Sequence, residues 1–174
     1  MRQFETVSCG DAELDPTEAC DDGAANGTLA SCCTAGCDDA AQATACEDGD
    51  ACTVGDQCSA AGVCQAGAPV APPGEVAHAR FGADKSALLF DPIPGAVHDV
   101  ARGLVSELPV GAGAAEVCLQ SGLAGALASI GGAPAPQQAF WYLVRARHAC
   151  GTGTYGYRAA NGVPGPERIT SVCP

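Results

Sequence analysis

The sequence is poor in basic side chains, in aromatic side chains and in long apolar runs. Its 174 residues include 8 Lys and Arg against 20 Asp and Glu, a net charge of −12, and only 5% are aromatic. A protein that holds nucleic acid by neutralising phosphates needs an excess of basic residues, which excludes nucleic acid as a partner. No apolar run approaches the roughly 20 residues of a membrane-spanning helix, which excludes a transmembrane segment.

Cysteine is the residue in excess. Twelve cysteines in a chain of this length are typical of oxidising compartments, where disulfides replace part of a hydrophobic core. No apolar segment of a signal peptide follows Met1, so we interpret the chain as part of a longer exported protein, located extracellularly or at the cell surface. A reduced zinc-binding protein is the alternative. Zinc sites with four thiolates usually combine two short cysteine pairs, and only Cys33 and Cys37 have that spacing here.

The composition changes abruptly within the chain, at residues 67–74. Residues 1–66 contain 13 acidic residues and one basic residue, whereas residues 67–174 contain seven of each. The first segment has seven large apolar residues and nine cysteines, and the second has 28 and three. We therefore predict a disulfide-rich, acidic module over 1–66, a Pro/Ala/Gly linker over 67–74 and a second domain over 75–174.

Disulfides must hold the first module together. Seven large apolar side chains cannot offset the entropy of ordering 66 residues, whereas each closed loop of this size contributes roughly 3 kcal/mol. We expect little regular secondary structure, with turns at Asp22-Gly23, Asn26-Gly27 and Asp48-Gly49. The disulfide candidates in this module are Cys9, Cys20, Cys32, Cys33, Cys37, Cys46, Cys52, Cys58 and Cys64.

Two stretches of this module carry a family resemblance. They are CGDAELDPTEACDDG at 9–23 and the C-x5-C-x5-C-x5-C run at 46–64. Both resemble the disintegrin-like, cysteine-rich modules of secreted metalloprotease-disintegrins and of large exported deltaproteobacterial proteins. The resemblance implies a structural calcium ion. Its ligands would be the side chains of Asp11, Asp15, Glu18 and Asp21 and the backbone carbonyls of Ser8 and Glu13.

The chemistry of this acidic loop agrees with calcium, because calcium takes six to eight oxygen ligands. A bound dication would also relieve the repulsion within a module of net charge −12. The alternative interpretation is that these acids form a solvated surface. The adhesive loop of the animal family corresponds to 47–57 here, and no Arg precedes Gly-Asp in it, so integrin recognition through Arg-Gly-Asp is not implied.

The second module has the pattern of an antiparallel β-sandwich. From Lys85 onward, short apolar runs alternate with Gly and Pro turns. Two stretches resemble fibronectin type III domains, LLFDPIPGA (88–96) and AFWYLVRARHACGTG (139–153). Phe90 stands at the position where the family usually has a Trp, and Phe140 stands where it has the Tyr of the tyrosine corner. Successive side chains of a strand point to opposite faces, so the long strand predicted at 140–147 has two faces. Phe140, Tyr142, Val144 and Ala146 would face the core, opposite Trp141, Leu143, Arg145 and Arg147.

The second module has an odd number of cysteines, Cys118, Cys150 and Cys173. Cys150 ends the long strand and Cys173 follows the last one, so we predict a bond between them. Because both modules have an odd count, full pairing requires one bond between modules, and Cys118 is then its C-terminal candidate. A free thiol in each module, or a partner in a further part of the protein, is the alternative.

No catalytic motif surrounds the three histidines, His78, His98 and His148. His98 stands where the fibronectin pattern has an aromatic residue, so we interpret it as a packing residue. Trp141 either stacks on a sugar or peptide or packs under a loop. Arg145 and Arg147 are expected to form a solvated strand face.

Together these patterns predict a mostly β protein that is not an enzyme. We expect a non-catalytic, calcium-stabilised extracellular module of a larger exported or surface protein, serving adhesion or interaction with an extracellular protein or glycan. The alternative is a purely structural spacer attached to a secreted hydrolase or peptidase.

Overall fold

The chain divides into two units, Met1–Val70 and Ala71–Pro174. The computed structural model describes residues 8–160 and 163–174. The predicted linker, residues 67–74, spans the division. The fold is mostly β, with small antiparallel sheets and a disulfide-rich irregular part, as the sequence predicted.

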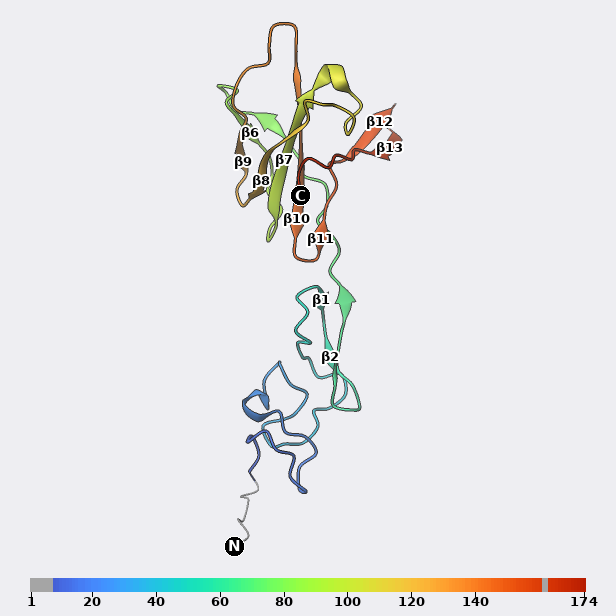
Figure 1. Ribbon diagram of the computed structural model, residues 1–174. Coiled ribbons are helices and arrows are strands. Elements are labelled where there is room, and N and C mark those ends of the chain that lie inside the picture. Colours follow the sequence, from blue (N-terminus) through green and yellow to red (C-terminus); the bar gives the residue numbers. More distant parts are fainter. Residues whose placement is uncertain (1–7, 161–162) are drawn as a thin grey trace. The chain divides into compact units, whose positions relative to one another are not determined.

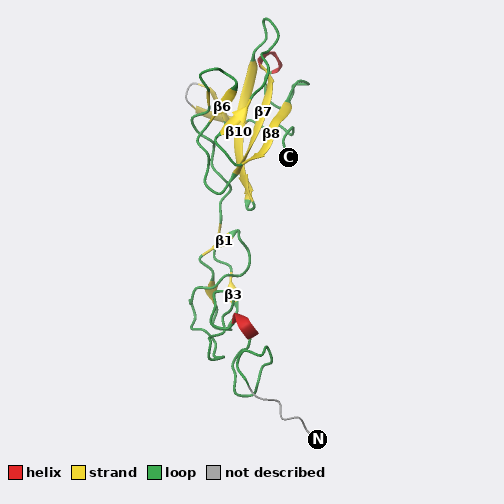
Figure 2. Ribbon diagram, turned by 90° about the vertical axis from the view of Figure 1, so that its left-hand side faces the viewer, coloured by secondary structure: helices red, strands yellow, loops and turns green. Residues whose placement is uncertain are grey.

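The first unit has almost no regular secondary structure. Figure 2 shows it drawn mainly as loops. Its described residues, 8–70, contain one short 3-10 helix, η1 (Gly23–Ala25), and two antiparallel pairs of two-residue strands. Glycines at positive φ, including Gly23, Gly27 and Gly49, occupy the predicted turns. The strands are β1 (Thr53–Val54) with β4 (Ala68–Pro69), and β2 (Gln57–Cys58) with β3 (Cys64–Gln65).

Sulfur replaces aliphatic side chains in the core of this unit. The buried cluster consists of Cys32, Cys46 and Cys58, with Cys64 and Ala40 packed against it. Cys33 and Cys37, the pair with zinc-like spacing, have different disulfide partners, so the thiolate-zinc interpretation is wrong. The bonds are Cys9–Cys37, Cys20–Cys33, Cys32–Cys58 and Cys46–Cys64.

The second unit contains a three-stranded and a four-stranded antiparallel sheet (Figure 1). The smaller sheet has the order β5-β6-β9 and the larger has the order β11-β10-β7-β8. A separate hairpin pairs β12 with β13, and the 3-10 helix η2 (Val105–Glu107) follows β7. The bounds are β5 Arg80–Phe81, β6 Ala87–Leu89, β7 Val97–Leu104, β8 Val117–Leu123, β9 Leu127–Ser129, β10 Phe140–His148, β11 Gly151–Thr152, β12 Tyr157–Ala160 and β13 Val163–Glu167.

Both sheets contribute to one hydrophobic core. Leu88 of β6 and Ala128 of β9 meet Val100 of β7 and Val144 of β10 there, with Phe90 and Ile130 from the adjoining loops. Tyr142 packs against this cluster, which confirms the predicted inner face of β10 for Tyr142 and Val144. Phe90 is buried against the ring of His98, at 5.0 Å between ring centroids.

The opposite face of the larger sheet is also covered. Trp141 and Leu143 of β10 pack against a buried cluster of Ala101, Tyr155 and Cys173. Trp141 also lies directly over Gly103 of β7, where a Cβ would come within 2.4 Å of its ring. The chain end therefore lies on the face that alternation left open to solvent, and of the two interpretations of Trp141, packing agrees with the structure.

The disulfide of this face differs from the prediction. Cys173 bonds to Cys118 of β8 and closes a loop with a sequence separation of 55 residues. The predicted Cys150–Cys173 bond is therefore wrong, and so is the prediction that Cys118 bonds to the first module. The reason is the path of the last residues. They lie over the centre of the sheet, where Cys173 Sγ is 3.7 Å from the carbonyl oxygen of Val100, and they reach the neighbouring strand β8.

Peptide mapping under non-reducing conditions tests this pairing. All twelve cysteines lie in the described part of the chain and each is disulfide-bonded, so we expect no thiol to react with a sulfhydryl reagent. We also expect the five linked pairs given above. One bond between the modules stays a prediction from the odd counts. Two reactive thiols per chain would contradict it.

Candidate functional site

A groove opens at one end of the second unit because its two sheets differ in length. β10 has nine residues and β7 has eight, whereas β6 and β9 have three each. At about 3.3 Å per residue, β10 extends for about 30 Å and β9 for about 10 Å. The inner face of β10 therefore continues beyond the smaller sheet, and a cavity of about 720 Å³ lies over it.

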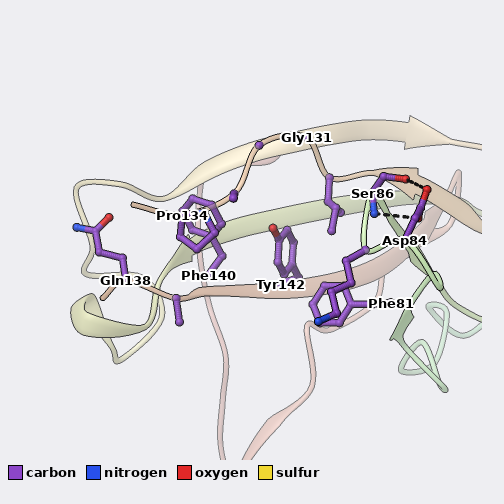
Figure 3. Close-up of a pocket in the computed structure, with 13 residues that line it drawn as sticks. Phe81, Asp84, Ser86, Gly131, Pro134, Gln138, Phe140 and Tyr142 are labelled. Atoms are coloured by element: carbon purple, nitrogen blue, oxygen red, sulfur yellow. Dashed lines mark hydrogen bonds between the residues drawn. The ribbon is translucent and has the colours of Figure 1, made fainter. Parts of the chain in front are cut away.

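Three aromatic rings line this groove (Figure 3). Phe140 and Tyr142 come from the inner face of β10, and Phe81 comes from β5. Tyr142 meets both neighbours edge to face, with centroids 5.6 Å from Phe81 and 6.3 Å from Phe140. Phe81 is 51% exposed. The Arg102 guanidinium covers Phe140 at 4.4 Å from the ring centroid and donates a hydrogen bond to the carbonyl oxygen of Ile130.

Polar groups lie at the two ends of the aromatic row. Asp84 and Ser86 lie at the Phe81 end and Gln138 lies at the Phe140 end (Figure 3). The Asp84 carboxylate accepts two hydrogen bonds, from the Ser86 amide at 3.0 Å and from its hydroxyl at 2.7 Å. These bonds hold the pKa of Asp84 below its ordinary value. The groove thus combines an apolar floor with a fixed acceptor at one end.

Sequence reasoning missed this groove. It assigned Phe140 and Tyr142 to the core and gave Phe81 no role. The available signal was the aromatic pair at alternate positions of β10, which continues past the last residues of the smaller sheet. Trp141, the aromatic residue singled out for ligand stacking, lies on the other face, and its Nε1 is buried without a hydrogen-bond partner among the described residues.

Arg145 and Arg147 are not a solvated strand face, and that expectation is wrong. Both bind the carboxylate of Asp99, which is fully buried in β7, at 3.2 and 3.0 Å. Ser121 Oγ and the Gly122 amide also donate to this carboxylate. Arg145 further donates to the backbone oxygens of Cys173 and Pro174, so the network also holds the last residues.

Burial and the Arg145 and Arg147 side chains shift the pKa values of Asp99 and Tyr155 in opposite directions. Burial acts to raise the pKa of Asp99, but its hydrogen-bond donors outweigh it and hold the pKa below the ordinary value of 3.8. Burial raises the pKa of Tyr155 to about 12, although the Arg145 guanidinium opposes this and lies 4.9 Å from the ring centroid. Asp99 is therefore ionised and Tyr155 is neutral at physiological pH.

The three histidines have structural contacts. His98 is fully buried, and its Nε2 accepts a hydrogen bond from the Ile93 amide. Its Nδ1 must then be the protonated nitrogen, which donates to the carbonyl oxygen of Leu123. His78 Nδ1 lies 2.6 Å from the exposed carboxylate of Asp91, and His148 Nδ1 accepts from the Cys150 amide.

The predicted calcium ligands bind backbone amides. Asp21 accepts hydrogen bonds from the amides of Gly10, Asp11 and Gly23 and from the Asn26 side chain, at 2.8–3.2 Å. Desolvation acts to raise the pKa of Asp21, but these bonds outweigh it and lower the pKa. The remaining acids form local caps: Ser8 N donates to Asp15, Asp15 N to Glu18, and Glu13 N to Asp11.

The oxygen donors of this loop suit calcium in type. Within residues 8–160 and 163–174, the groups of ligand atoms that are close enough to share an ion are Cys32 with Cys46 and Cys58, and Glu18 with Cys9 and Cys37. All these cysteines are in disulfides and offer no thiolate. The four predicted carboxylates do not form such a group among the described residues, and their binding of calcium stays a prediction.

Comparison with known proteins adds no relative: no family model, curated protein or solved structure matches the chain. In the part of the chain that the structure describes, no helix is long and apolar enough to cross a membrane.

Replacing Asp99 by Asn tests the buried ion pairs. Removing the charge leaves two partly buried guanidinium groups uncompensated, so we expect a loss of about 3 kcal/mol or more in unfolding free energy, measured by denaturant titration. Because folding lowers the pKa of Asp99, its contribution is present above the ordinary value and is lost as pH falls through the folded value. The Asn variant should lack this acid dependence.

The matched control is Asp91→Asn, which removes the same charge from an exposed pair with His78. Exposed pairs contribute about 0–1 kcal/mol, so this variant should be nearly as stable as the parent. Equal stability of the two variants would contradict the structural role of Asp99.

Proposed function

We propose that the protein is a non-catalytic module of an exported or surface protein and that its second unit binds an extracellular protein or glycan. The observation that carries this proposal is the groove over β10, with three aromatic rings and polar groups at both ends. Such a combination of apolar floor and few polar groups is typical of ligand sites, and its volume lies within their usual range.

The remaining features support an extracellular setting. The twelve cysteines are disulfide-bonded, a state that reducing compartments do not maintain. The second unit has one sheet of three strands, one sheet of four strands and a hydrophobic core to which both contribute. This arrangement supports the resemblance to fibronectin type III domains. The first unit, with nine cysteines and a short acidic loop between Cys9 and Cys20, supports the resemblance to disintegrin-like modules.

A binding screen of the full chain tests this function. The labelled protein is applied to a panel of extracellular polysaccharides, oligosaccharides and matrix proteins, and Phe81→Ala is compared with the parent. We expect at least one ligand whose binding weakens tenfold or more, which equals about 1.4 kcal/mol, because the substitution removes one wall of the groove. Leu127→Ala is the control, since Leu127 is 53% exposed and lies outside the groove lining.

Absence of binding across the panel would contradict the binding function and favour a structural spacer. Equal loss of binding in both variants would also contradict it, because the groove would then not be the binding surface.

Calcium stabilisation of the first module is part of the same proposal, on the basis of the resemblance. Binding to the folded form alone would stabilise it by about 2.7 kcal/mol at a hundredfold excess over Kd. We expect calcium to raise the melting temperature of the first module and a chelator to lower it, with Asp11→Asn plus Glu18→Gln removing the difference. The control is Asp38→Asn plus Asp39→Asn, which removes the same charge elsewhere in the module.

An unchanged melting curve in calcium and in chelator would show that the acids of residues 11–21 act only as caps for backbone amides.

A further inference from the structure

We propose that the groove binds a neutral sugar chain, with the C–H face of one ring on the exposed ring of Phe81, the hydroxyls of that ring at Asp84 and Ser86, and the chain running along the groove towards Gln138. This inference rests on the proposed binding function and narrows its ligand class. It follows from how polarity, charge and backbone groups are distributed around the groove.

Polarity in the groove is arranged as a sugar requires. A pyranose has apolar C–H faces and a polar edge of hydroxyl groups. The groove offers an aromatic floor between two polar ends, Asp84 with Ser86 at one and Gln138 at the other (Figure 3). The Asp84 carboxylate is ionised and held by Ser86, so it is an oriented acceptor for a hydroxyl donor. The amide of Gln138 can both donate and accept.

Charge in the groove selects a neutral ligand. Among its lining residues the charged ones are Asp84 and Lys85, which are adjacent and opposite in sign. The nearby guanidinium of Arg102 covers Phe140 and donates to the carbonyl oxygen of Ile130. The lining residues therefore carry no net charge, and the positive charge of Arg102 lies against the Phe140 ring and the Ile130 carbonyl oxygen.

An extended peptide fits this floor less well than a sugar does. The floor is the face of β10, and the backbone groups of a strand point within the plane of its sheet towards the neighbouring strand, here β7, and not out of its face. A peptide strand laid on the rings would find no backbone partner from β10, and each unpaired amide or carbonyl in an apolar setting costs about 1–3 kcal/mol. Sugar hydroxyls project sideways towards the rim instead.

Ligand-observed NMR tests this inference on the full chain. The probes are methyl β-glucoside, methyl β-galactoside, N-acetylglucosamine, cellobiose and lactose, with glucuronic acid as a charged ring of the same size. We expect saturation transfer from the protein to ring C–H protons of at least one neutral probe, and weaker transfer to glucuronic acid. Phe81→Ala should abolish the transfer, Gln138→Ala should reduce it severalfold, and Leu127→Ala should leave it unchanged.

The outcomes separate this inference from the proposed function. If no neutral sugar receives saturation transfer, but a matrix protein or peptide binds in a way that depends on Phe81, the function stands and the sugar assignment is overturned. If no sugar and no protein binds, both fail. Because Gln138 is an exposed rim residue, its variant keeps the inference testable even if Phe81→Ala disturbs the short strand β5. Transfer that persists unchanged in the Gln138 variant would overturn the assigned rim contact.

Discussion

The antiparallel pairing of β7 with β10 is the constraint on which the second unit depends. Its register runs through eight residue pairs, from Phe140 opposite Leu104 to Arg147 opposite Val97. On the inner face this register places Val144 beside Val100 in the core, and on the outer face it places Arg145 beside Asp99. A shift of one residue would exchange the faces and put both arginines against the hydrophobic core. Core packing and ion pairing therefore select the same register.

The sequence pattern predicts the surroundings of the side chains on the inner face of β10 but not of those on its outer face. A period of two residues identifies which side chains share a face, and the inner face carries the apolar set. The two-residue period does not indicate which residues cover the outer face. There the cover is Tyr155 and the last residues of the chain, and the counter-ion Asp99 lies 46 residues before Arg145. Charged residues on a strand are usually solvated, so only the long-range contact distinguishes this case.

Cysteine counts gave the class of the first unit without giving its bonds. Eight cysteines can be paired into four bonds in 105 ways and this unit has nine cysteines, so spacing alone does not choose the bonds. In the acidic loop, the residue types suggested ion ligands, whereas the structure uses the Asp21 carboxylate to bind the amides of Gly10 and Gly23. Carboxylates near several amides satisfy buried donors in the same way that they satisfy a cation, so composition does not separate the two roles.

The groove arises from two local rules acting at the same end of the sheets. Its floor is aromatic because β10 keeps its apolar alternation after the three-residue strand β9 has ended. Its ends are polar because turn residues flank the strands there. Strand chemistry and turn chemistry thus meet in one cavity, so a site with an apolar centre and polar ends follows from the fold itself.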